Sequence, residues 1–395
     1  MSRTRRAIGF VSALTLLALC ASRLSADPLR LRADAVGQAR EPSGLLVLQG
    51  EDRKYPWVDA EALVWTGARG HADATADVLV LTLRLREPHG YAELRGGRFV
   101  FTTGAIRPTP LDGVSAIGRL PGGTSVEVAG GAPVVPRFGP RPYAWMGGGR
   151  VAQQIASRLT LGASYAREQA NGEITNEEIG ADLATVPFTW LDVAARSAYD
   201  ISSPGVADAQ VSSALRFAPW RVELFGTHRS PSRLLPATSL FSVLGDFPSQ
   251  IAGTTNRWDA APRLDLLATA AGQDVGGELG GYGWFRTTLR FDDRGDGSIG
   301  VEVRRQSVAT VHWSGVRLIS AEGLSAHWRT SAEMEVAWED DARGRGTAWP
   351  WGLWSLAWRS GSGWEAAAAL EMGATPVNRF EVDGLLRLSR TLEVP

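Results

Sequence analysis

Two short motifs place a histidine and a serine two residues apart, a spacing that puts both side chains on one face of a β-strand. They are His228-Arg229-Ser230 and His312-Trp313-Ser314. A histidine beside a serine hydroxyl is the minimal pair for nucleophilic catalysis, because the imidazole can take up the hydroxyl proton. No carboxylate can be assigned as a third partner. We therefore expect both histidines to be structural and the protein not to be an enzyme.

The sequence offers little to bind a cofactor or a metal. Lys54 is the only lysine, which excludes a phosphate loop built around lysine. Five histidines and one cysteine, Cys20, argue against a structural zinc site. Residues Asp292 to Gly297 have the outline of a calcium loop, but Arg294 occupies the third ligand position, so we expect a hairpin turn there. The net charge of −1 gives no basic excess for nucleic acid.

The first 26 residues have the pattern of a secretory signal peptide. Arg3, Arg5 and Arg6 form a basic start, and a mostly apolar run follows from Ala7 to Cys20. Leu24-Ser25-Ala26 then provides a site of small residues, so cleavage is expected after Ala26. An alternative is lipidation at Cys20, although the preceding leucine is unusual at such sites. The apolar run is short for a membrane anchor.

Downstream, long segments alternate between apolar and polar residues with a period of two, which is typical of strands with two different faces. Examples are residues 189–200, 210–217, 298–306 and 380–389. Turn signals such as Asn171-Gly172 and Ser203-Pro204-Gly205 separate them. Glu365 to Met372 has helical propensity, but its neighbours favour another strand.

These strands indicate a membrane wall more than a soluble sandwich or barrel. Their lengths match the 9–11 or so residues that a tilted strand needs to cross hydrocarbon. Trp349 and Trp351 precede Trp358 by seven to nine residues, which predicts aromatics at both membrane interfaces. We predict an all-β, single-domain transmembrane antiparallel β-barrel over residues 27–395, with about 16–18 strands because bacterial barrels take even numbers. A long loop is expected at about residues 230–260, either extracellular or folded into the lumen.

The polar faces carry both signs of charge, as expected for a wet lumen. Mixed charge favours polar neutral cargo, such as a saccharide, over a strongly charged ion. The side chains predicted to line the pore by alternation are Asp192, Arg196, Arg216, Arg221, Glu223, Glu302, Arg304, Asp383 and Arg387.

Cleavage after Ala26 would remove four arginines and leave 37 basic and 42 acidic residues, a net charge of −5. The signal peptide, the alternating strands, the tryptophans near strand ends and this acidic charge together resemble Gram-negative outer-membrane β-barrels of the porin-like kind. The resemblance implies an outer-membrane location, contact with outer-membrane lipid, and insertion by the assembly machinery. One departure is the end of the chain, Leu392-Glu393-Val394-Pro395, which lacks the terminal aromatic residue common in such barrels. Gly96-Gly97-Arg98-Phe99 and Leu111-Asp112-Gly113 are also similar to porin-like barrels of myxobacteria, some of which are linked to exopolysaccharide export.

Three functions therefore stand open. The leading hypothesis is a channel that passes polar solutes and needs no cofactor. The second is a dedicated exopolysaccharide exporter that works with periplasmic export partners. The third is a structural barrel whose lumen is plugged.

Overall fold

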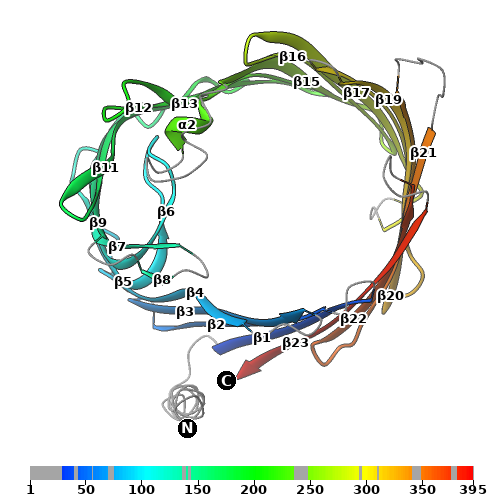
Figure 1. Ribbon diagram of the computed structural model, residues 1–395, viewed down its shortest axis with the longest axis horizontal. Helices are drawn as coiled ribbons and strands as arrows, with labels where there is room; N and C mark the ends of the chain where they lie inside the picture. The colour runs from blue at the N-terminus through cyan, green and yellow to red at the C-terminus, as the bar shows by residue number, and fades with distance from the viewer. Residues whose placement is uncertain are drawn as a thin grey trace.

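In the computed structural model, long antiparallel strands form a closed ring around a central lumen (Figure 1). The structure describes residues 29–39, 43–55, 57–69, 75–135, 139–140, 144–234, 248–292, 296–308, 311–339, 348–374 and 380–394. The predicted signal peptide, including Cys20, lies outside these residues. No helix in the described ranges is long and apolar enough to cross a membrane.

The elements follow one another around the ring in chain order. They are β1 (Leu29–Gln38), β2 (Ser43–Tyr55), β3 (Val58–Arg69), β4 (Thr75–Arg86), β5 (Ala92–Phe101), β6 (Thr109–Arg119), β7 (Thr124–Val135), β8 (Gly139–Pro140), β9 (Ala144–Ile155), β10 (Leu159–Ala170), β11 (Glu173–Phe188), β12 (Leu191–Asp200), β13 (Gly205–Phe217), β14 (Trp220–Arg229), α2 (Pro231–Leu234), β15 (Ser249–Ala261), β16 (Leu264–Val275), β17 (Glu278–Arg290), β18 (Ser298–Val308), β19 (Val311–Gly323), β20 (Trp328–Glu339), β21 (Ala348–Arg359), β22 (Trp364–Gly373) and β23 (Glu381–Val394).

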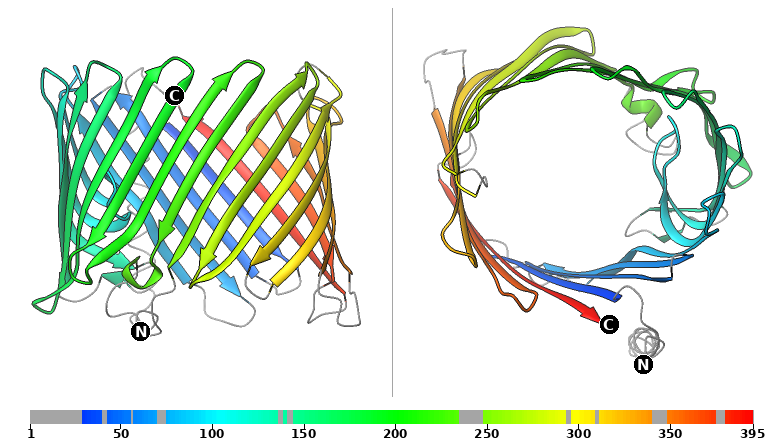
Figure 2. Two further views of the ribbon diagram at one scale, coloured as in Figure 1. Left: turned by 90° about the horizontal axis from the view of Figure 1, so that it is seen from above. Right: turned by 180° about the vertical axis from the view of Figure 1, so that it is seen from behind.

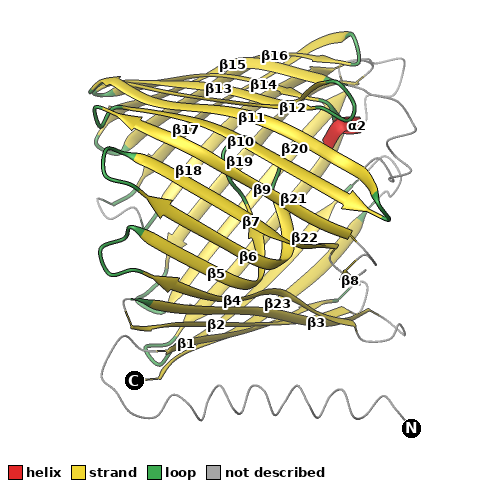
Figure 3. Cartoon of the chain, turned by 90° about the vertical axis from the view of Figure 1, so that its left-hand side faces the viewer, coloured by secondary structure: helices red, strands yellow, loops and turns green. Residues whose placement is uncertain are grey.

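The first and last strands close the ring. β1 pairs with β2 on one side and with β23 on the other, from Leu29 opposite Val394 to Gln38 opposite Leu385. Figure 3 shows β1 and β23 lying together in the wall, and Figure 2 shows the common tilt of the strands. The two-residue β8 pairs with β7. The other 22 strands form the barrel. Closure removes the free sheet edges that hydrocarbon does not tolerate.

The predicted all-β antiparallel barrel is confirmed, but the predicted number of 16–18 strands is too low. Several hairpins turn through two residues that contain no glycine, and the alternation of one strand runs almost directly into the next. Thr189-Trp190 joins β11 to β12, and Pro262-Arg263 joins β15 to β16. Such turns lack the Gly and Asn signals by which hairpins are recognised in a sequence. Glu365 to Met372 forms part of β22.

The outer surface of the wall is apolar. Large aliphatic side chains that no other element covers include Leu81, at 51% exposure, Val211, at 51%, and Leu386, at 67%. In water such a surface would be strongly unfavourable, whereas lipid chains match it. The two faces of each strand therefore meet two different environments, which explains the period of two in the sequence.

Outward-facing aromatics collect at the rim where β1 begins and β23 ends. Phe188 stacks on Trp190 with ring centroids 5.1 Å apart, and Trp190 stacks on Phe217 at 5.4 Å. Trp220 and Trp258 form a further stacked pair at 5.1 Å. Such a belt matches the aromatic girdle of a membrane barrel.

The three tryptophans predicted for the membrane interfaces lie on two different faces of β21. Trp358 lies at this rim, opposite Trp328 of β20. Trp349 and Trp351 lie on the other face of β21, because an odd separation from Trp358 inverts the direction of a strand side chain. Trp351 is paired with the charged Glu335 and faces the lumen. The predicted interface role of Trp349 and Trp351 is corrected accordingly.

An arginine on the outer face should impair folding. Val211, near the middle of β13, faces outward. We expect Val211→Arg to destabilise the barrel by about 2–4 kcal/mol, because a guanidinium at mid-membrane is poorly solvated. Gln210→Arg, at the neighbouring inward position, should fold normally. The measurement is heat-modifiable gel mobility after refolding in detergent and lipid; equal mobility of the two variants would contradict the assignment of faces.

The predicted loop at residues 230–260 is shorter than expected. Residues 249–260 belong to β15, and residues 231–234 form α2, which projects into the ring in Figure 1. Arg233 holds α2 against the barrel: it donates to Ser230 Oγ at 2.7 Å and to the carbonyl of Ser203 at 3.0 Å. Residues 235–247 lie outside the described residues.

Candidate channel interior

A hairpin folds from the wall into the barrel. The segment 102–108, here called the inner tip, joins β5 to β6 and lies inside the ring with part of β6 (Figures 1 and 2). It is well packed: Ile106 is 1% exposed and Ala105 4%. Phe99, Phe101, Leu111, Met146 and Ala166 complete an apolar cluster around it. This cluster lies on the lumen side of the wall and identifies the inward face of β9 and β10.

A row of glycines lies where the strands bend inward. Gly97 of β5 pairs with Gly113 of β6, which pairs with Gly131 of β7. Gly97 has φ of +118°, and a Cβ there would overlap the carbonyl oxygen of Leu81. A Cβ on Gly113 would collide with the backbone of the next strand. The row, called the crease below, allows three adjacent backbones to approach and bend together.

Buried charges fix the inner tip to β10 and β11. Arg107 Nε lies 3.2 Å from Glu178 Oε1, and its Nη2 lies 3.5 Å from Glu168 Oε2. The Glu178 side chain is 1% exposed and also accepts a hydrogen bond from Asn176 at 3.0 Å. Thr103 donates to Glu127 of β7. Because each buried carboxylate has a partner, the folded-in position is electrostatically satisfied.

The inward fold leaves a short seam between β4 and β5. These strands pair from Leu81 opposite Arg98 to Arg86 opposite Glu93, and residues 75–80 of β4 pair with β3 alone. Arg98 covers the free edge. It donates to the carbonyl of Val78 at 2.9 Å and to Asp112 through two nitrogens at 2.7 Å each. Side chains thus take over hydrogen bonds that a neighbouring strand would otherwise make.

Directly paired residues on neighbouring strands point to the same side of a sheet. The strand registers therefore show, from the inner tip onwards, which residues of each following strand face inward. On this basis the structure places all nine side chains predicted from alternation on the inward side. They are Asp192, Arg196, Arg216, Arg221, Glu223, Glu302, Arg304, Asp383 and Arg387.

Most of these charges neutralise one another across the wall. Arg216 forms an ion pair with Asp192. Arg221 pairs with Glu223 at 2.5 Å, and Arg196 approaches Asp208 to 3.4 Å. On β23, Arg387 Nε donates to Asp34 of β1 at 3.0 Å, and Asp383 accepts from Gln38.

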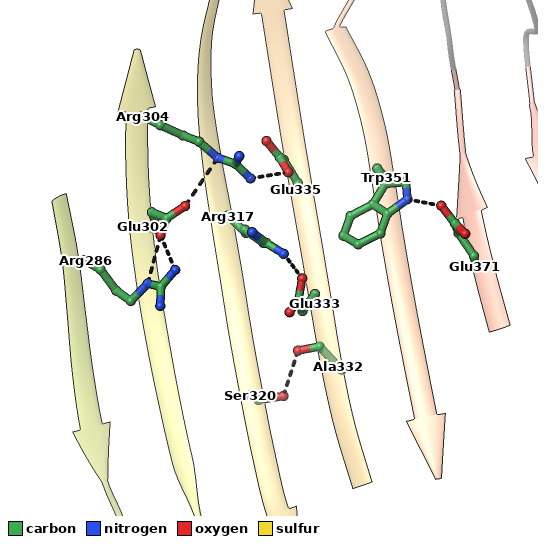
Figure 4. A network of polar contacts seen from close by, with 10 residues as sticks. All are labelled: Arg286, Glu302, Arg304, Arg317, Ser320, Ala332, Glu333, Glu335, Trp351 and Glu371. Carbon is green, nitrogen blue, oxygen red and sulfur yellow. Dashed lines mark hydrogen bonds and ion pairs between the residues drawn. The ribbon is translucent and has the colours of Figure 1, made fainter. Parts of the chain in front are cut away.

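A connected chain of polar contacts crosses from β17 through β18 to β20, and separate contacts lie beside it on β19 to β22 (Figure 4). Arg286 donates to Glu302 at 2.8 Å, and Glu302 also pairs with Arg304 at 3.3 Å. Arg304 continues to Glu335 at 2.5 Å. In addition, Arg317 donates to Glu333, and Trp351 Nε1 donates to Glu371 at 2.6 Å. The result is a polar wall with alternating charge signs and little uncompensated charge.

Sequence reasoning missed the inner tip and its anchors. It predicts a loop at 230–260, either extracellular or folded into the lumen, whereas the buried contacts inside the barrel belong to the segment 102–108. The available signal was the glycine spacing: Gly96-Gly97, Gly113 and Gly130-Gly131 fall in three successive strands. Without the register, no pattern shows that these glycines are neighbours.

The two histidine–serine motifs contact different elements of the barrel. Ser230 is fully buried and accepts from Arg233, as described above. His312 Nδ1 lies 2.7 Å from Ser307 Oγ of β18. Among the described residues, no cluster of three or more His, Cys, Asp or Glu side chains could hold a metal ion.

Comparison of the fold identifies its class. The structure is similar to the translocation pore of the P pilus usher PapC, with a TM-score of 0.55 and 10% identity, covering 93% of this chain and 99% of that one. The fold is that of an outer-membrane β-barrel. A crystal structure of the same usher pore gives a TM-score of 0.51 at 9% identity, covering 93% of this chain and 99% of that one. PapC in an E. coli P pilus tip assembly intermediate gives 0.54 at 10% identity, covering 95% of this chain and 62% of that one.

No protein-family model matches the sequence of this barrel, and no curated protein matches it either. At these identities the likeness concerns the fold alone.

Proposed function

We propose that the protein is a passive channel of the bacterial outer membrane that passes polar, mainly uncharged solutes. The observation that carries this proposal is the inner wall, on which arginines and carboxylates are matched across neighbouring strands. Paired charges attract water and offer hydrogen bonds, yet they leave little net field to select cations or anions. The apolar outer surface with its aromatic belt supports the membrane location.

The inner tip would narrow this channel from one side. It lies along β9 to β11 and presents Thr102 and Pro108, both exposed, to the lumen. Barrels of this size enclose a lumen wide enough for water when nothing fills it. Solute size would then be limited by the space between the inner tip and the opposite wall, on which β17 to β21 lie (Figure 1).

Conductance tests the proposal directly. Purified protein in planar bilayers should give stepwise currents, and its reversal potential in a salt gradient should indicate a cation-to-anion permeability ratio of about one, because the lining charges are paired. Correctly folded protein without any conductance would support the plugged barrel instead. A strongly selective current would show that the ion pairs do not neutralise the lumen.

The alternative function, a dedicated exopolysaccharide exporter, predicts different results. Periplasmic export partners would have to engage the rim of the barrel, and deletion of the gene would remove surface polysaccharide. Unchanged surface polysaccharide combined with conductance would favour the passive channel.

A further inference from the structure

Besides Trp349, three tryptophans face the lumen on one side of the barrel. Trp284 lies on β17, Trp313 on β19 and Trp351 on β21. Trp313 is paired with Gln306, which is paired with Tyr282 on β17. Trp351 is paired with Glu335, and the row continues through Arg317 and Glu302 to Arg286 on β17. The three rings therefore lie within two residues of the same level along the strands. They are half-buried, so part of each ring surface remains accessible.

Each of these rings has a guanidinium over one of its faces, which leaves the other face for a ligand. Arg286 lies 5.4 Å from the ring centroid of Trp284, Arg304 lies 5.8 Å from that of Trp313 and Arg317 lies 5.9 Å from that of Trp351. These arginines belong to the network of Figure 4, in which glutamates hold them. The contacts fix the direction of the guanidinium groups and support the rings.

The register also places small residues between the aromatics. Trp284 and Trp349 occupy the same row, and the residues between them, after Arg304, are Gly315 and Ala337. Gly315 is buried, and a Cβ there would lie 3.4 Å from Trp313 Cζ3 and 3.4 Å from Glu335 Oε1, so the Trp313 ring and the Glu335 carboxylate lie over the backbone of the wall at this point. Alternate strands lie roughly 10 Å apart, so a ligand that touches all three tryptophans must be extended.

From these observations we infer that the wall from β17 to β21 is a binding track for a neutral oligosaccharide. A sugar ring presents C–H groups on its faces and hydroxyls at its edge. Tryptophan faces pack against the C–H groups, while carboxylates and guanidinium groups accept and donate hydrogen bonds at the edge. The ligand is neutral because Arg286, Arg304 and Arg317 are already matched by glutamates. The inference rests on the proposed channel function and specifies its substrate class.

The test uses maltohexaose and cellohexaose as probes of wild-type protein in planar bilayers. We expect at least one of them to block the open-channel current reversibly, and hexagalacturonate to block no better. Trp351→Ala should raise the half-blocking concentration of the effective probe about fivefold, through loss of one stacking surface. Trp351→Phe should retain most of the affinity. The matched control is Trp354→Ala, which changes a tryptophan on the outward face of the same strand that is 49% exposed.

Failure of this inference can be told apart from failure of the channel proposal. A barrel that conducts but is blocked by neither hexasaccharide overturns the track, and so does an equal response of Trp351→Ala and Trp354→Ala. Binding is also measured without current, by equilibrium dialysis of labelled hexasaccharide against detergent-solubilised protein. A barrel that does not conduct but binds sugar in a Trp351-dependent way overturns the channel and retains the track. Heat-modifiable mobility confirms folding of each variant.

Discussion

Replacement of Arg107 by alanine is expected to release the inner tip from the barrel wall. The substitution removes the guanidinium that pairs with Glu168 and Glu178 under the tip, and Glu178 is almost wholly buried. Removal of one partner from a buried ion pair costs about 3–5 kcal/mol. That penalty acts on the folded-in position, because in the released position water can reach the carboxylates. We expect larger single-channel conductance and a tip that moves away from β10 and β11.

Proteolysis provides a readout that does not depend on current. Phe101 is 2% exposed in the folded-in hairpin and should resist chymotrypsin. In Arg107→Ala the bond after Phe101 should become cleavable while the rest of the barrel stays intact. Arg86→Ala is the control, since Arg86 pairs with Asp59 and Glu93 but is 41% exposed, and exposed pairs contribute about 0–1 kcal/mol. If Arg107→Ala remains protected and conducts like wild type, the apolar cluster alone holds the tip.

The sequence was sufficient for the class of fold because one physical constraint acts on every strand. A residue at each position faces either lipid or lumen, so apolar and polar side chains alternate along Leu191–Asp200 as they do along Ser298–Val308. Residues 365–372 form a strand in spite of their helical propensity, because pairing with β21 on one side and β23 on the other outweighs the weak strand preference of alanine.

What could not be predicted depends on which strands are neighbours. The distance of Trp351 from Trp358 along the chain predicts an interface residue, but the odd parity of that distance places the ring on the lumen side. The contact of Arg107 with Glu178 joins residues far apart in the chain. Only the inward fold of β5 and β6 brings them together, and neither residue is part of a recognisable motif.

The crease predicts a second large effect, at Gly113. An ideal Cβ on Gly113 would run into the carbonyl oxygen of Gly130 and would lie 2.7 Å from Cα of Gly131. Both obstacles are backbone atoms of β7, so no side-chain rotation can relieve them. Gly113→Ala should therefore separate β6 from β7 at the crease, at a cost of about 3 kcal/mol or more, and much of the protein should fail to reach the heat-modifiable folded form.

Gly118 offers the same substitution on the same strand without an obstacle. A Cβ there meets nothing within 4 Å, and alanine suits a strand at least as well as glycine. Gly118→Ala should therefore assemble as wild type does, with equal yield and melting temperature. Because both variants add one methyl group to β6, a difference between them isolates the close approach of β6 and β7. Equal folding yields would mean that the strands can separate at no cost, and the crease would then not be what bends the hairpin into the lumen.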